Sequence, residues 1–179
     1  MFPEEDLHPA RRACADDIPA IRELERRAGE PFRSVGLDSV ADDDPPDAAE
    51  LALSVDDGRV LVVDADDVTA AAPLAAWLWT GSADGDLLIE QVSVAPEYRG
   101  RRLGTTLVAL AVTLARRRGC LGVCLTTFDE IPWNGPLYRR LGFLRLDPDD
   151  LGPDLRSIRD AERAAGLDVA PRSAYRRNV

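Results

Sequence analysis

The sequence contains no lysine, and all 22 of its cationic side chains are arginines. Aspartate and glutamate together total 32, so the formal net charge is −10 at pH 7. A chain this acidic is poorly suited to a polyanion, so we do not expect nucleic acid as a partner. We attribute the lack of lysine, together with the Ala, Asp and Arg bias, to genome composition rather than to chemistry.

Side chains that bind metals or form disulfides are also scarce. The chain has three cysteines, Cys14, Cys120 and Cys124, and His8 is the one imidazole that could accompany them. The cysteines include no C-x-x-C pair, so zinc sites and disulfides are weakly supported. We expect no metal, and we expect free thiols buried in the strands of a cytoplasmic protein.

Long apolar runs are absent as well. No segment of the sequence approaches the roughly 18–20 apolar residues of a membrane span. The acidic N-terminus also lacks the pattern of a secretory signal peptide. We therefore expect a protein that works away from membranes.

The remaining pattern predicts an α/β fold in one domain, residues 1–179, with 148–179 as a C-terminal extension packed on it. Trp77 and Trp79 share one face of a predicted strand; they could line a pocket, but we favour packing in the core. Apolar segments predict strands at 7–14, 59–64, 71–80, 87–95, 121–127, 142–147 and 171–177. Helices are predicted at 17–29, 48–53, 103–118, 135–141 and 149–165.

The segment from Val92 to Leu107 runs from a predicted strand through a loop into the longest predicted helix. Gly100 and Gly104 permit conformations and close approaches that a Cβ would forbid, and three arginines within 99–102 add positive charge. The N-terminus of a helix presents unpaired amides and the positive end of its dipole. The sequence therefore predicts that a phosphate-bearing cofactor binds here.

Two segments resemble motifs of the GNAT superfamily of N-acyltransferases. Residues 94–104, Val-Ala-Pro-Glu-Tyr-Arg-Gly-Arg-Arg-Leu-Gly, resemble its acetyl-CoA pyrophosphate loop, Arg/Gln-x-x-Gly-x-Gly/Ala, with Arg102 in place of the middle glycine. Residues 138–143, Tyr-Arg-Arg-Leu-Gly-Phe, resemble the family's Tyr-x-x-Leu-Gly-Phe segment. The resemblance covers roughly residues 7–147. It implies a GNAT-like fold, with a central mixed, twisted sheet of about six to seven strands flanked by helices. A C-terminal helix and strand are added to it.

The resemblance also implies acetyl-CoA as co-substrate. Backbone groups of the strand that ends at Val94 would bind the pantetheine arm like an added strand, and an N–H near Val94 would polarise the thioester carbonyl. Asn134 has two interpretations, a helix N-cap or a CoA contact, and the commoner family spacing would place that asparagine at about Ile131. The residues expected to bind the cofactor are Val92, Ser93, Val94, Arg99, Gly100, Arg101, Arg102, Leu103, Gly104, Thr105 and Asn134.

Two side chains are candidates for acid–base chemistry. Tyr138 resembles the tyrosine that the family places beside the thiolate as general acid, and a phenol keeps its proton at neutral pH. The other interpretation is a tyrosine that only packs at the start of its segment. Glu90 shares a strand face with Val92 and Val94, so it could deprotonate an ammonium directly or through a water. It could equally be paired with a nearby arginine.

The acceptor has no motif of its own. In the family, the region between the first two helices borders the acceptor pocket, so Glu30 and Phe32, in the loop that we expect there, are candidates for substrate contact. They could also be an ordinary helix terminus with one packed aromatic. The negative charge favours a cationic acceptor, and the oligomeric state stays open, with a homodimer as one option.

The sequence therefore predicts an N-acetyltransferase that passes an acetyl group from acetyl-CoA to a primary amine of a small molecule or peptide, by direct attack in a ternary complex. The alternative is a regulatory module that binds an acyl-CoA without turnover. Arg102 favours that alternative, whereas Tyr138 and Glu90 oppose it. A toxin-type acetyltransferase acting on aminoacyl-tRNA would need a basic surface, which the overall charge does not favour.

Overall fold

The computed structural model of the protein describes residues 7–66 and 72–179. Contacts group the chain into two compact units, which are described separately below. Unit 1 comprises residues 1–80 and 91–110, and unit 2 comprises residues 81–90 and 111–179. The predicted strand at 71–80 begins with Ala71, which lies outside the described residues.

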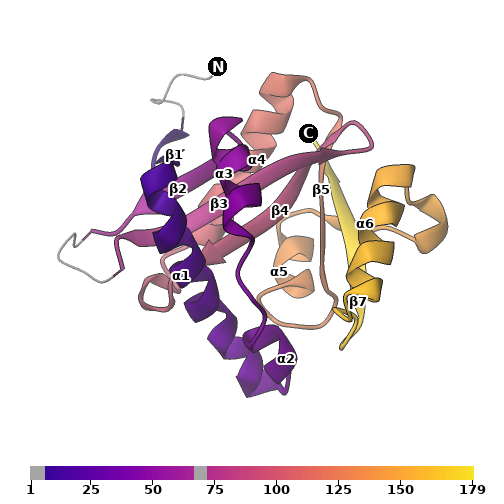
Figure 1. The fold of residues 1–179 in the computed structure, drawn as a ribbon. Coiled ribbons are helices and arrows are strands. Elements are labelled where there is room, and N and C mark those ends of the chain that lie inside the picture. The colour runs from indigo at the N-terminus through magenta and orange to yellow at the C-terminus, as the bar shows by residue number, and fades with distance from the viewer. Residues whose placement is uncertain (1–6, 67–71) are drawn as a thin grey trace. The chain divides into compact units, whose positions relative to one another are not determined.

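The described residues contain seven strands in one sheet, with the order β1-β2-β3-β4-β5-β7-β6 (Figure 1). The β4–β5 pair is parallel, whereas β1–β2, β2–β3, β5–β7 and β6–β7 are antiparallel, so the predicted mixed sheet is confirmed. The strands are β1 (Arg11–Arg12), β2 (Val60–Asp64), β3 (Leu74–Ala83), β4 (Asp86–Val94), β5 (Gly122–Phe128), β6 (Leu144–Arg145) and β7 (Arg172–Asn178).

Helices flank the sheet, as the sequence predicts. No helix within 7–66 and 72–179 is both long and apolar enough to cross a bilayer. The α-helices are α1 (Ile18–Gly29), α2 (Asp38–Ala41), α3 (Ala48–Asp56), α4 (Leu103–Arg118), α5 (Gly135–Arg140) and α6 (Pro153–Ala164). The longer 3₁₀ segment η3 (Glu30–Val35) follows α1, and η4 (Pro96–Tyr98) follows β4.

Three predictions about local structure were wrong. The first strand is only Arg11–Arg12 rather than residues 7–14, because Ala10 donates to the carbonyl of Leu7 in a turn and Pro9 has no N–H to donate. The expected loop at Glu30 is the 3₁₀ helix η3, which continues directly from α1. The thiols are buried only at Cys124, where burial raises the thiol pKa to about 12, whereas Cys14 is exposed and Cys120 is half-buried.

Unit 1 is held by an apolar core between α1, β2 and β3. Residues 60–63 of β2 are all buried, as is typical of a strand covered on both faces. Trp77 and Trp79 are buried and stack with ring centroids 6.3 Å apart, so their predicted place in the core is confirmed. From α1, Ile21 and Leu24 join this core.

Unit 2 has its own core, in which the C-terminal extension takes part. Leu155 of α6 and Ala174 of β7 pack with Leu88 and Cys124. The hairpin turn between β3 and β4 also contacts α6, because Asp84 accepts hydrogen bonds from the N–H groups of Asp154 and Leu155. Residues 148–179 therefore contribute to the core of this unit rather than trailing from it.

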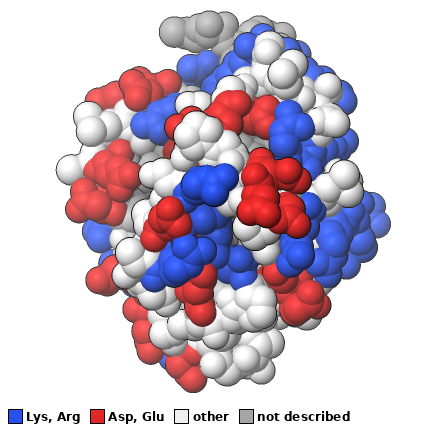
Figure 2. Space-filling view, turned by 90° about the vertical axis from the view of Figure 1, so that its right-hand side faces the viewer, with Lys and Arg blue, Asp and Glu red and all other residues white. Residues whose placement is uncertain are grey.

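Arg159 joins α6 to β7 from a buried position, with only 6% of its surface exposed. Its guanidinium donates to both carboxylate oxygens of Asp168, at 2.8 and 3.0 Å, and to the carbonyl of Arg172 at 2.9 Å. It also pairs with Glu162 at 2.5 Å. Figure 2 shows acidic and basic side chains interspersed on one face of the molecule. The ion pairs and hydrogen bonds of Arg159 thus hold α6 against β7.

We predict that Arg159→Ala lowers the free energy of unfolding by about 2–3 kcal/mol, because it removes a buried guanidinium that bridges Glu162, Asp168 and the carbonyl of Arg172. Arg163→Ala is the matched control on the same helix: Arg163 is exposed, pairs with Asp160 at 2.8 Å and approaches Asp168 only to 3.6 Å. Its loss should cost roughly 0.5 kcal/mol or less. Urea denaturation measures both variants, and equal effects would contradict the role given to Arg159.

Candidate active site

The turn from β4 into α4 is built in unit 1 by two residues with left-handed backbone. Gly100 has φ of 79° and Arg102 has φ of 64°. The N–H of Thr106 makes the first helical bond, to the carbonyl of Arg102 at 2.9 Å. The N–H groups of Leu103, Gly104 and Thr105 therefore have no acceptor within α4. Three amides at the positive end of a helix, with no acceptor in that helix, fit a phosphate group.

Gly104 is not required by contacts within unit 1. A Cβ added there would meet only the Cγ2 of Val94, at an ordinary contact distance of 3.5 Å. The side of the helix that carries Gly104 is therefore open for a ligand to approach the backbone.

The arginine side chains of this turn are mostly occupied by protein groups. Arg99 donates to the carbonyl of Ala28, at the C-terminus of α1, over 3.2 Å. Arg101 lies over the ring of Tyr98, 4.6 Å from its centroid, and pairs with Asp66 at 3.0 Å. Arg102 is exposed. Of the three arginines predicted to bind the cofactor, two therefore also hold the turn in place.

The strand that leads into this turn is β4, and its last residues carry the predicted pantetheine-binding backbone. Ser93 is buried, and Val92 and Val94 are half-buried. After the strand, the N–H of Ala95 donates to the carbonyl of Ala75 in β3, at 2.9 Å. The parallel pairing of β4 with β5 covers only Leu87–Val123 and Leu88–Cys124.

A carboxylate that sequence reasoning missed lies beside this strand. Glu25 of α1 accepts a hydrogen bond from the indole N–H of Trp77 at 3.0 Å, and another from the side-chain amide of Gln91. A signal was present in the sequence, because Glu25 follows Ile18 by seven residues and Ile21 by four, and so lies on the buried face of α1. A charged residue on an apolar helical face needs a partner.

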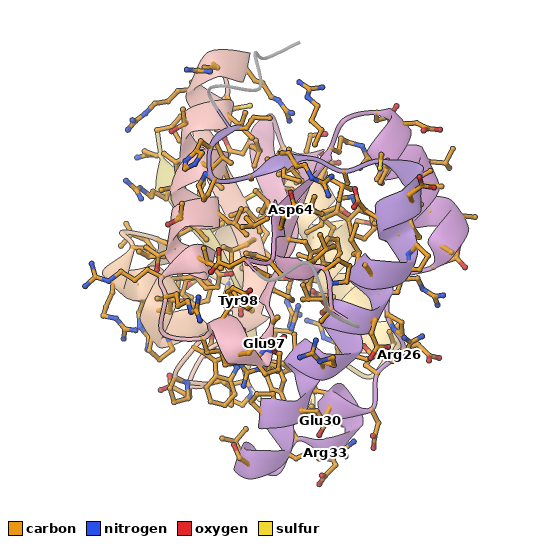
Figure 3. The ribbon with its side chains drawn as sticks, turned by 90° about the vertical axis from the view of Figure 1, so that its left-hand side faces the viewer. Arg26, Glu30, Arg33, Asp64, Glu97 and Tyr98 are labelled. Carbon is orange, nitrogen blue, oxygen red and sulfur yellow. The ribbon has the colours of Figure 1, made fainter. Side chains whose placement is uncertain are left out.

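The candidate substrate residues lie on η3 in unit 1. Glu30 is exposed and pairs with Arg33 at 3.2 Å, and Figure 3 shows both at the end of α1. Phe32 is half-buried. Arg33 also pairs with Asp42. The structure therefore leaves Glu30 accessible but already engaged with an arginine.

In unit 2, Glu90 is exposed. Its carboxylate lies over Gly81, so closely that a Cβ at residue 81 would collide with it. By strand alternation it faces away from the side of β4 that carries Gln91 and Ser93. An exposed carboxylate is a weaker candidate for a general base than one withdrawn from water.

Tyr138, also in unit 2, is buried and packs edge-to-face on Phe143, with centroids 5.6 Å apart. Burial raises the pKa of its phenol above the ordinary value, so the hydroxyl stays protonated at neutral pH. Tyr138 thus has the protonation state of an acid.

Asn134 lies at the N-cap position of α5, but its side chain does not cap the helix. Instead its amide donates to the hydroxyl of Thr127 at 2.7 Å, so the N-cap interpretation of the side chain was wrong. Its buried oxygen Oδ1 has no partner among the described residues. An unpaired acceptor of this kind suits a ligand that donates a hydrogen bond.

The comparison with known proteins identifies the class. The pattern that describes the Acetyltransferase (GNAT) family matches residues 18–143, which is more than half of the chain. The chain therefore belongs to this family, and the predicted resemblance is confirmed.

The individual proteins that this chain resembles either match it over a short segment or share at most 19% sequence identity with it. A segment of 61 residues is 43% identical to a probable N-acetyltransferase camello of Xenopus tropicalis; it spans 34% of this chain and 28% of that protein. The fold is similar to PaiA N-acetyltransferase of Thermoplasma acidophilum in complex with coenzyme A, with a TM-score of 0.67, 13% identity and coverage of 95% and 98% of the two chains. It is also similar to N-acetylglutamate synthase of Neisseria gonorrhoeae in complex with coenzyme A and N-acetyl-glutamate, with a TM-score of 0.68, 19% identity and coverage of 94% and 34%.

We predict that Arg102→Gly stabilises the protein by about 0.5–1 kcal/mol. The change relieves a left-handed backbone that costs a residue with a Cβ about 1–2 kcal/mol, and the larger backbone entropy that glycine loses on folding offsets part of this gain. Arg102→Ala removes the same side chain but keeps the strain, so it should show no such gain. Urea denaturation compares the two variants with the wild type. A less stable glycine variant would show that the conformation at residue 102 is not strained.

Proposed function

We propose that the protein is an N-acetyltransferase that uses acetyl-CoA to acetylate a primary amine of a small molecule or peptide, by direct attack in a ternary complex. The observation that carries this proposal is the turn from β4 into α4, with Gly100 and Arg102 left-handed and the first amides of the helix without an acceptor in α4. Family membership and the similarity of the fold to coenzyme A complexes support it.

The cofactor-binding part of the proposal lies in unit 1. The N–H groups of Leu103, Gly104 and Thr105 would hold the diphosphate, and the backbone of Val92–Val94 would bind the pantetheine arm. When bound, acetyl-CoA supplies an activated thioester. An N–H near Val94 would polarise its carbonyl.

The proton that the departing thiolate needs is assigned to Tyr138. Its family position and its raised pKa support this role. The free Oδ1 of Asn134 supports a further contact to the cofactor.

The acceptor is proposed to be a cationic amine rather than a nucleic acid. The net charge of −10 supports this choice. Glu30 and Phe32 are proposed to contact the acceptor. The cytoplasm is proposed as the site of action, and a homodimer is one assembly to test.

The second candidate is a module that binds acyl-CoA without turnover, and the exposed position of Glu90 favours it. A thiol-release assay over a panel of amines separates the two functions. Binding without any amine-dependent release of CoA would support the module.

We predict that acetyl-CoA binds with a Kd between about 1 µM and 1 mM, measured by isothermal titration. Gly104→Ala should weaken binding at least about tenfold without loss of stability, because the added methyl has room in the protein but lies where the ligand approaches. Absence of binding by the wild type at millimolar acetyl-CoA would refute the proposal.

We predict that Tyr138→Phe lowers kcat by roughly 10²-fold and leaves the affinity for acetyl-CoA within about threefold of the wild type, since only the proton donor is removed. Phenylalanine preserves the edge-to-face contact with Phe143, so the melting temperature serves as the control for folding. An unchanged kcat would show that Tyr138 only packs in the core and does not donate the proton.

A further inference from the structure

Glu25 is placed by α1 on the side of β4 that carries Gln91 and Ser93. One oxygen accepts from Trp77 over 3.0 Å, the other from Gln91, and the hydroxyl of Ser93 also donates to this carboxylate. Gln91 in turn donates to Ser93 over 3.2 Å. The carboxylate is therefore fixed by three donors, two of which come from the strand that leads to the proposed cofactor site.

All three of these donors are neutral. In the parts of the chain that the structure describes, no arginine lies within ion-pair distance of Glu25, and Asp43, beyond α2, adds repulsion. Burial raises the pKa of Glu25 above the ordinary value of a glutamate, more than the hydrogen bonds from Ser93, Trp77 and Gln91 lower it. The fold thus keeps a carboxylate partly out of water without a countercharge.

Such an arrangement is costly for a purely structural group. A neutral glutamine at residue 25 could accept from the indole N–H of Trp77 and, with the side-chain amide of Gln91 turned over, donate to Gln91, without withdrawing a charge from water. An uncompensated carboxylate is useful where a cation arrives or where a proton must be accepted. Both needs arise when an alkylammonium must become an amine.

We propose that Glu25 is the general base that accepts the proton of the acceptor's ammonium group. This inference rests on the proposed acetyl transfer. One N–H bond of the ammonium breaks and its proton forms an O–H bond with a carboxylate oxygen of Glu25. The electron pair left on the nitrogen then attacks the thioester carbonyl. In this account Glu90, which is exposed, does not accept the proton.

The test compares Glu25→Gln with the wild type and with Glu23→Gln, a matched change at an exposed residue of the same helix that pairs with Arg26. Each is assayed for kcat against pH by thiol release with an amine acceptor, and for acetyl-CoA affinity by titration. We expect Glu25→Gln to lower kcat roughly 10²-fold and to remove the decrease in kcat at acidic pH that the wild type shows. Its affinity for acetyl-CoA should stay within about threefold. Glu23→Gln should match the wild type.

Wild-type protein provides a second measurement that does not depend on a variant. Carboxyl ¹³C NMR should give Glu25 a pKa above that of an ordinary glutamate, and the acidic limb of kcat should fall at the same pH. Activity is lost as pH falls through this pKa, because the protonated carboxyl cannot accept a proton.

The outcomes separate the two proposals. An active wild type whose acidic limb persists in Glu25→Gln, or disappears in Glu90→Gln instead, overturns the role of Glu25 and leaves acetyl transfer standing. A mismatch between the NMR pKa and the kinetic limb overturns it as well. A wild type that binds acetyl-CoA but releases no thiol with any amine refutes acetyl transfer itself, and the role of Glu25 with it.

Discussion

The turn between β4 and α4 is the main constraint on the backbone of unit 1, because the chain must change direction from a strand to a helix within a few residues. It does so through left-handed backbone at Gly100 and Arg102. Glycine takes this conformation without strain, whereas arginine does so at a cost of about 1–2 kcal/mol. The family pattern has a glycine where this chain has Arg102, and the backbone nevertheless keeps the conformation that a glycine would favour. The departure from the motif therefore does not remove the turn.

Helix α1 is tied to this turn at its C-terminal end. Arg27 pairs with Glu97 at 2.5 Å, and Arg99 donates to the carbonyl of Ala28 at 3.2 Å. Figure 3 shows Glu97 on the segment that passes the end of α1. The same helix carries Glu25, and η3 with Glu30 follows it directly. One helix thus connects the proposed acceptor residues to the proposed cofactor turn.

Much of the fold could be predicted from the sequence, because its signals are local. The apolar run of β2, the stripe of α1 and the terminal glycines are visible in short windows of sequence. Short edge strands are less visible, since β1 and β6 have two residues each and depend on their neighbours in the sheet. The strand predicted at 7–14 is shortened to Arg11–Arg12 because a turn at residues 7–10 comes before it.

The residues of the candidate site also differ in how far they could be predicted from local sequence. The turn and Tyr138 belong to contiguous motifs, whereas Glu25 acquires its environment from Trp77 and Gln91, which are 52 and 66 residues away. Its position on the buried face of α1 was the available signal. The side chain of Asn134 could not be assigned either, because its partner Thr127 lies on β5 and competes with the capping role.

The central claim is that the amides at the start of α4, which have no acceptor within the helix, bind a diphosphate. Amide ¹H–¹⁵N NMR during titration with acetyl-CoA tests it most directly, with acetyl-pantetheine, which lacks the diphosphate, as the comparison. The account predicts that the resonances of Leu103, Gly104 and Thr105 shift with acetyl-CoA and stay in place with acetyl-pantetheine. Saturation with acetyl-CoA that leaves these three amides unmoved would contradict it.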